Sequence, residues 1–125
     1  MNQKSTIASF GNIETHMDWD HLREFVSDDS DLEIEILSIF FENTPNYIKE
    51  LESSDVMEWA ATCHKIKGAA RAIGAWAFAY QSELAELADP PEIDSSGRKV
   101  IIDILKGKLK VLQQEISSQH DVFTE

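Results

Sequence analysis

The sequence predicts an all-α protein, an antiparallel up-down-up-down four-helix bundle with a short additional N-terminal helix. Four long segments place apolar residues at helical intervals of three and four, and no segment requires a strand. The chain has 125 residues, of which 42% are hydrophobic, enough for one compact core and too few for two. The links between the segments are short, so consecutive helices should pack side by side.

The N-terminal part predicts a lead followed by two helices. Residues 1–17 show no sustained period, and we expect an irregular or partly helical lead in which Ile7, Phe10 and Ile13 could dock as a short cap. A short amphipathic helix starts at Asp18. A longer one, capped by Ser30 or Asp31, has its apolar positions at Leu37, Phe40, Phe41, Thr44, Ile48 and Leu51. Pro45 removes a backbone donor, so this helix should kink near residues 41–45 rather than break.

The middle of the chain predicts a helical hairpin. Asp55 can cap a third helix that runs to about Ile73, with a buried stripe formed by Trp59, Cys63, Ile66, Ala70 and Ile73. Gly74 and Ala75 form the turn. A fourth helix should run from Ala75 to about Ala88, stopped by Pro90 and Pro91, with apolar positions at Ala77, Tyr80, Leu84 and Leu87.

The C-terminal part predicts one more long helix. Residues 89–97 form a turn-rich connection. A fifth helix, opening near Ser95 or Ser96, should turn Ile101, Leu105, Leu109, Leu112 and Ile116 inward and keep Lys106, Lys108 and Lys110 mostly exposed. We therefore assign residues 18–118 to the bundle and residues 119–125 to a frayed tail.

One histidine, His64, lies within the third helix but off its apolar stripe. Lys67 and Gly68 follow one turn later and Arg71 two turns later, so all three are expected on its side of the helix. An anion on His64 would then meet cations. A glycine inside a helix costs roughly 1 kcal/mol relative to alanine, and here the missing side chain would leave room for a phosphoryl group and a partner. The alternatives for Gly68 are close helix packing or a helix end.

Geometry links this histidine to a glutamate on the next helix. His64 lies eleven residues before Ala75 and Glu86 lies eleven after it, so the two should stand at the same level of the hairpin. The alternative is a solvated glutamate on an exposed helix face.

The stretch from His64 to Ala70, followed by Ile73, Gly74 and Ala75, resembles the His-x-(Leu/Ile)-Lys-Gly-(Ser/Ala)-(Ser/Ala) signature of histidine-containing phosphotransfer (HPt) domains. The resemblance extends over about residues 18–118, outside the motif through helix pattern rather than residue identity. It implies that His64 accepts a phosphoryl group from a receiver-domain aspartate and hands it to another, and that Lys67 steadies that group.

The resemblance also gives Glu86 a role. It is similar to the Glu or Gln that, in this family, accepts a hydrogen bond from the imidazole nitrogen that is not phosphorylated, which would fix the tautomer and leave the other nitrogen nucleophilic. Arg71 is less standard in the family, and the local positive charge we assign to it is our own inference.

The absence of certain motifs limits the chemistry. There is no Gly-rich nucleotide loop, P-loop or well-spaced acidic metal trio, so we expect a phosphohistidine carrier without kinase motifs rather than an enzyme. It should need no cofactor of its own, and Mg²⁺ would be supplied by the partner receiver domain. The expected partners are response-regulator receiver domains, a hybrid sensor histidine kinase, or both. The chain could itself be a module of such a kinase, and we expect a monomer.

Charge and composition restrict partners and location. A formal net charge of -12 argues against nucleic-acid binding, whereas the cations gathered around His64 suit a partner whose site is rich in carboxylates. No apolar run is long enough to span a bilayer, no signal peptide is evident, and the single cysteine, Cys63, favours a cytoplasmic protein. Because adjacent helix residues diverge by about 100°, a Cys63–His64 nucleophile pair is not expected.

Two other classes of function remain open. One is a non-phosphorylated helical adaptor in which His64 merely lies on the surface. The other is a metal-binding or redox bundle using His16, His21, His64 and His120, although their spacing is poor and no Glu-x-x-His pair recurs on two helices. His21 and His120 are expected to be surface residues.

Overall fold

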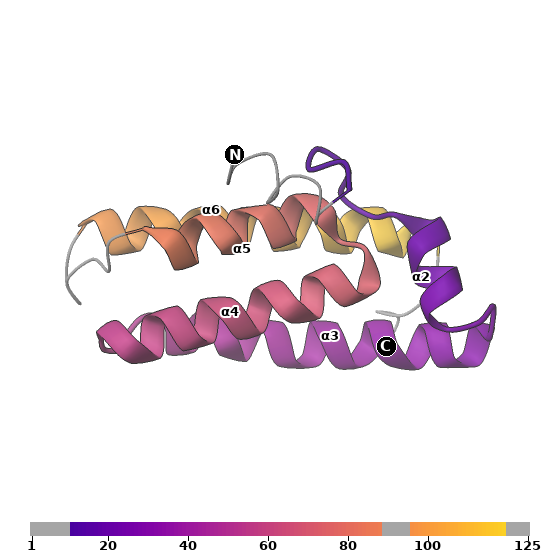
Figure 1. Ribbon diagram of the computed structural model, residues 1–125, viewed down its shortest axis with the longest axis horizontal. Coiled ribbons are helices and arrows are strands. Elements are labelled where there is room, and N and C mark those ends of the chain that lie inside the picture. Colours follow the sequence, from indigo (N-terminus) through magenta and orange to yellow (C-terminus); the bar gives the residue numbers. More distant parts are fainter. Residues whose placement is uncertain (1–10, 89–95, 120–125) are drawn as a thin grey trace.

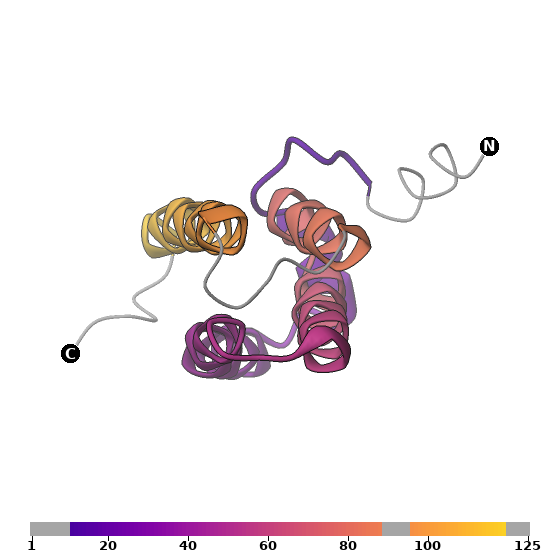
Figure 2. The ribbon, with the colours of Figure 1, turned by 90° about the vertical axis from the view of Figure 1, so that its left-hand side faces the viewer.

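The computed structural model describes residues 11–88 and 96–119, and every regular element in these ranges is a helix. The helices are α2 (Trp19–Phe25), α3 (Ser30–Glu50), α4 (Val56–Ile73), α5 (Trp76–Leu87) and α6 (Ser96–Ser117). The long helices α3 to α6 lie along the long axis of the molecule and α2 crosses one end (Figure 1). Viewed from one end, the four long helices are arranged around a common centre (Figure 2), where the buried side chains form one cluster. The predicted all-helical class is confirmed.

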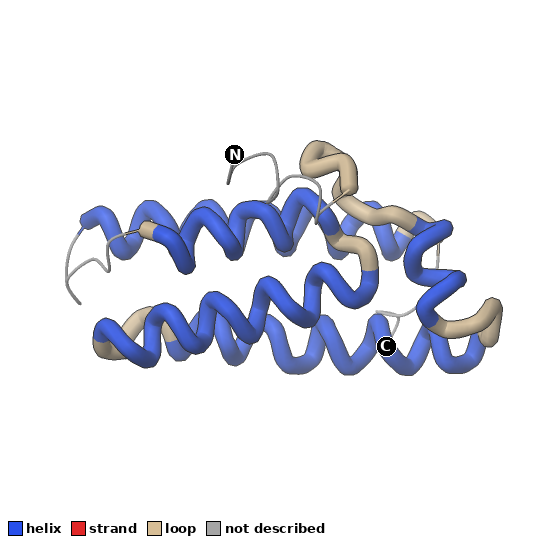
Figure 3. The backbone as a smooth tube through the Cα atoms, in the orientation of Figure 1, coloured by secondary structure: helices blue, strands red, loops and turns tan. Residues whose placement is uncertain are grey.

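Each long helix packs against two others around this core. α4 contacts α3 and α5, and α6 contacts α5 and α3, with α4 and α5 the most intimate pair. Figure 3 shows how short the loops at residues 51–55 and 74–75 are. The buried core draws on every helix, and its largest fully buried side chains are Trp59, Phe78, Leu22, Leu37, Ile48, Leu51, Ile66, Ile73, Leu105, Leu112 and Ile116. The predicted stripe of α4 is buried at all of its positions.

The helix starts follow from capping side chains. Asp29, rather than the predicted Ser30 or Asp31, caps α3, because its carboxylate accepts the Leu32 N–H at 3.0 Å. Asp55 caps α4 as predicted, and with Glu58 it forms a reciprocal capping box. Pro45 lies inside α3, which continues unbroken to Glu50, so the helix does not end at the proline.

The apolar face predicted for α5 was wrong at its two leucines, although Ala77 is buried and Tyr80 packs against the core. Leu84 is 43% exposed and Leu87 is 71% exposed, and Tyr80 is only half-buried. The buried face is instead formed by Phe78, Ala79, Ser82, Glu83 and Ala85, together with Trp76 and Ala77. Small side chains on this face allow α5 to approach α4 closely, and the Trp59 indole N–H reaches across to the Ala85 carbonyl at 2.9 Å. The face is therefore set by close packing rather than by the position of the leucines.

Other expectations for single residues also changed. His21 is not a simple surface residue, because its Nε2 lies 3.1 Å from the Ala72 carbonyl and its ring packs edge-on against Trp76. In α6, Ile102 is buried and Ile101 only partly. Ile13 packs against the core from the lead, whereas the predictions for Ile7, Phe10, His120 and most of the tail lie outside the described residues. Within the helices that the structure places, none is long and apolar enough to cross a membrane.

Candidate phosphoryl-accepting site

The α4–α5 turn sets the register of the site. Gly74 ends α4 in the left-handed region with φ of +84°, and the Ala75 N–H donates to the Ala70 carbonyl at 2.9 Å. A Cβ at Gly74 would stand 3.0 Å from the Asp18 carbonyl oxygen. The turn therefore favours glycine, and the start of α2 packs closely against it. Asp18 fixes the neighbourhood further, since its carboxylate accepts the Trp76 indole N–H at 2.9 Å and caps α2. The α4–α5 turn is thus held by its own backbone hydrogen bond and by contacts with Asp18.

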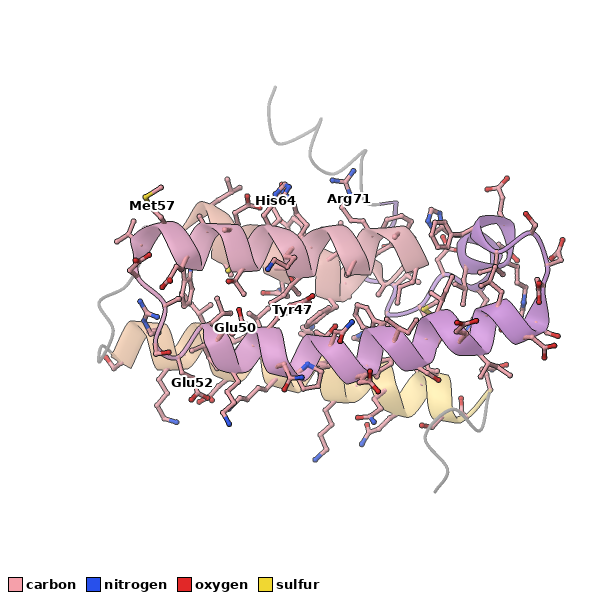
Figure 4. The ribbon with its side chains drawn as sticks, turned by 90° about the horizontal axis from the view of Figure 1, so that it is seen from below. Tyr47, Glu50, Glu52, Met57, His64 and Arg71 are labelled. Atoms are coloured by element: carbon pink, nitrogen blue, oxygen red, sulfur yellow. The ribbon has the colours of Figure 1, made fainter. Side chains whose placement is uncertain are left out.

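His64 projects from the exposed side of α4 at mid-helix. Its side chain is 67% exposed, and it lies on the same edge of the helix as Met57 and Arg71 (Figure 4). The Nδ1 atom lies 3.1 Å from Glu86 Oε2. A carboxylate can only accept, so this contact favours a proton on Nδ1 and leaves the lone pair on Nε2. The structure therefore brings together the two residues that the hairpin register paired.

Lys67 is not on the open side of α4, where the sequence placed it. It is 9% exposed, with Nζ 2.8 Å from Glu86 Oε1 and 3.1 Å from Glu83 Oε1. Burial alone would lower the pKa of Lys67, but the two carboxylates outweigh burial and raise it above its usual value. The ammonium therefore stays charged and pairs across the α4–α5 interface.

Glu83 is a site residue that the sequence reasoning missed. It is 9% exposed, and its carboxylate touches the Lys67 ammonium from the α5 side. The missed signal is the counting rule that found Glu86: Lys67 lies eight residues before Ala75 and Glu83 lies eight after it. The wrong apolar face for α5 concealed this pairing.

Gly68 and Arg71 border the space next to His64. Gly68 is exposed, and a Cβ added there would meet nothing within 4 Å, so the glycine does not serve close helix packing. Arg71 is half-buried and lines a hollow of mixed character, about 340 Å³ in volume, together with Gly68, His21, Phe25, Ala72 and Trp76. The face around the imidazole is therefore open on the Gly68 side.

An apolar hollow of about 300 Å³ lies beside this face, between α2, α3 and α4. It shares Phe25 and Ala72 with the hollow lined by Arg71, and its other apolar lining includes Ile36 and Ile39. Phe25 is 52% exposed and Ile39 is 48% exposed, which is unusual for large apolar side chains grouped around one concavity. Lys65 lines the same hollow, with its ammonium 5.1 Å from the centre of the Tyr47 ring.

The thiol of Cys63, next to His64 in the sequence, is not placed to act as a nucleophile. Cys63 is fully buried, and burial, with a smaller effect from the Glu86 charge, raises its pKa to about 12. No group of three or more His, Cys, Asp or Glu side chains in residues 11–88 and 96–119 is arranged to hold a metal ion.

An exposed imidazole whose Nδ1 contacts a carboxylate, carried on a helical bundle, has the arrangement that a phosphohistidine carrier requires. Comparison with family models gives a match to the Hpt domain over residues 35–118, more than half of the chain. The chain belongs to the Hpt domain family. Hpt domains are phosphocarrier modules of two-component phosphorelays, not enzymes, and they interact with receiver domains and kinases. Searches of curated proteins and of solved structures gave no match.

Proposed function

We propose that this chain is a phosphorelay intermediate that accepts a phosphoryl group on Nε2 of His64 from a receiver-domain aspartate and passes it to an aspartate of another receiver domain. The observation that carries the proposal is the 3.1 Å contact between Nδ1 of the exposed His64 ring and the Glu86 carboxylate, which leaves Nε2 facing solvent as the nucleophile. The alternation of chain direction along α3 to α6 in Figure 1 supports the up-down-up-down bundle in which we place this site.

The transfer step needs no proton movement on the ring. The Nε2 lone pair forms the N–P bond while the O–P bond to the partner aspartate breaks, and that carboxylate leaves with the bonding pair. The proton on Nδ1 remains, held by Glu86, so the reverse transfer releases a neutral imidazole rather than an imidazolide. Mg²⁺ and the acyl phosphate belong to the partner, and the chain needs no cofactor of its own for this step.

The surrounding residues have distinct parts in this proposal. Gly68 keeps the approach to Nε2 open, Lys67 acts from behind the ring through its pairing with Glu86, and Arg71 adds charge at the edge of the hollow that it lines. The apolar hollow lined by Phe25 and Ile39 is the surface on which we place the receiver domain, in a brief encounter of modest area. We further propose that the chain acts as a cytoplasmic monomer.

The test is phosphoryl transfer to the native chain and to two histidine variants. After incubation with a phosphorylated receiver domain and Mg²⁺, intact-mass analysis should show one acid-labile phosphoryl adduct on the native chain and none on His64→Gln. The matched control is His16→Gln, which removes a histidine from the lead and should leave the adduct unchanged. If several receivers all leave the native chain unmodified, the adaptor function replaces phosphotransfer.

A further inference from the structure

The charged groups behind His64 form a continuous chain across the α4–α5 interface. Glu86 contacts the ring through Oε2, and its buried Oε1 faces Lys67, whose ammonium also contacts Glu83. Lys67 and Glu83 are each 9% exposed, so their charges are poorly screened by water. We propose that Glu83 is a positioning residue for phosphotransfer that acts through Lys67. By sharing the Lys67 ammonium, it keeps the Glu86 carboxylate in contact with Nδ1 of His64 and leaves a net negative charge next to the ring.

The charge count explains why a second carboxylate is needed. With Glu86 alone, the buried Lys67 ammonium would neutralise the carboxylate that the ring depends on, and would draw it away from the imidazole. Glu83 gives the ammonium a second partner at 3.1 Å. The two carboxylates and one ammonium then carry a net charge of -1, which favours an N–H, rather than a lone pair, on the ring nitrogen that faces them.

Position on the helix supports this role. Glu83 and Glu86 are three residues apart, so both lie on the side of α5 that faces Lys67. Glu83 does not touch the imidazole, and no contact from it to the ring is needed. Its effect on His64 must therefore pass through Lys67 and Glu86, and this dependence can be measured.

The first measurement is the tautomer of His64 in the full, unphosphorylated chain, read from the ¹⁵N chemical shifts of the ring. We expect the Nδ1–H form to dominate in the native protein. Glu83→Gln keeps an oxygen near Lys67 and removes the charge, and should shift part of the population to the Nε2–H form that free imidazole side chains prefer. Glu35→Gln, which removes an exposed acid from α3, is the matched control and should leave the shifts unchanged.

The second measurement is a double-mutant cycle on the rate of phosphorylation by phosphoramidate, a small donor that needs no docking surface. Attack by Nε2 forms the N–P bond, and the P–N bond of the donor breaks with release of ammonia. We expect Glu83→Gln to slow the reaction by about threefold or more, and to have almost no further effect in a Lys67→Met background, because coupled residues in one charge network are not additive. Circular dichroism of each variant establishes that the bundle is folded.

The outcomes separate this inference, which rests on the proposed function, from that function itself. An equal effect of Glu83→Gln with and without Lys67, or no change in tautomer, overturns the positioning role of Glu83 while phosphorylation of His64 stands. If the native chain is not phosphorylated, phosphotransfer fails, yet a tautomer shift in Glu83→Gln would still support the relay of charge through Lys67.

Discussion

Gly68 lies in the interior of α4, where replacement by alanine should stabilise the protein and replacement by a large residue should slow phosphoryl transfer. A Cβ at this position meets nothing within 4 Å, so Gly68→Ala adds no clash and removes the entropic cost of a glycine in the middle of a helix. The expected gain in the free energy of unfolding is about 0.5–1 kcal/mol. For a chain of this length, about 1 kcal/mol corresponds to a rise of roughly 4 °C in Tm.

The molecule contains its own control for this substitution. Gly107 lies within α6, is exposed, and also has nothing within 4 Å of an added Cβ. Gly107→Ala should therefore raise Tm by a similar amount, measured by thermal unfolding followed by circular dichroism, without changing phosphoryl transfer. Gly68 lies one helical turn from His64 and borders the hollow beside it, whereas Gly107 lies on another helix.

Transfer from a phosphorylated receiver domain then separates the two positions. Gly68→Leu, which fills the open space beside the imidazole, should slow transfer at least tenfold, whereas Gly107→Leu should leave the rate within a factor of two. Phosphoramidate is small, so its reaction with Gly68→Leu should be slowed much less. A receiver-dependent rate at the native level in Gly68→Leu would refute the steric role, and a loss of stability in Gly68→Ala alone would show that the glycine serves the fold.

Three further predictions concern stability and reactivity. Asp18→Ala should lower the free energy of unfolding by about 1–2 kcal/mol, because the Trp76 indole N–H and the α2 N-terminus lose their acceptor. The Trp76 hydrogen bond holds the pKa of Asp18 below its ordinary 3.8. The difference in unfolding free energy between the native chain and the variant should therefore be complete above pH 3.8 and be lost as the pH falls through the lowered pKa, which unfolding measured at a series of pH values would show. Cys63, with its pKa raised to about 12 by burial, should resist Ellman's reagent at pH 8 in the folded protein and react only in denaturant; rapid reaction of the folded protein would contradict its burial. Arg98→Ala should cost about 2–4 kcal/mol in urea unfolding, because the buried guanidinium donates to the Leu51 carbonyl and lies 4.8 Å from the Trp59 ring; a change below about 0.5 kcal/mol would contradict that role.

The fold was predictable where one face of a helix differs strongly from the others. In α4, the large residues Trp59, Ile66 and Ile73 fall on a single stripe, and all are buried. In α5, aromatic residues, leucines and alanines occur on every side, so periodicity could not identify the inner face. Packing decided it: the alanines lie inside because they allow a close approach to α4, and Leu84 and Leu87 are left outside.

The site was predictable to the extent that it depends on register. A glycine turn fixes which residues of two antiparallel helices share a level, and that rule predicted Glu86 at the level of His64, where the structure has the two side chains in contact. Side-chain directions were harder to predict. Lys67 was expected on the open side of α4, yet its side chain turns toward α5, where its ammonium pairs with two carboxylates. Predicting this direction requires knowing which face of α5 is buried, and periodicity did not identify that face.

This turn of Lys67 changes how the charges around His64 act. The sequence shows Lys65, Lys67 and Arg71 as a cluster in an otherwise acidic chain, which suggests a positive patch facing the partner. In the structure the Lys67 charge is neutralised within the α4–α5 interface, and the Lys65 ammonium lies over the Tyr47 ring on the α3 side. Lys65 and Lys67 therefore point to different sides of α4, and an apolar hollow lies beside the face that carries His64. It follows that Lys67 acts on the His64 ring indirectly, by pairing with Glu86, rather than by presenting its charge to a partner.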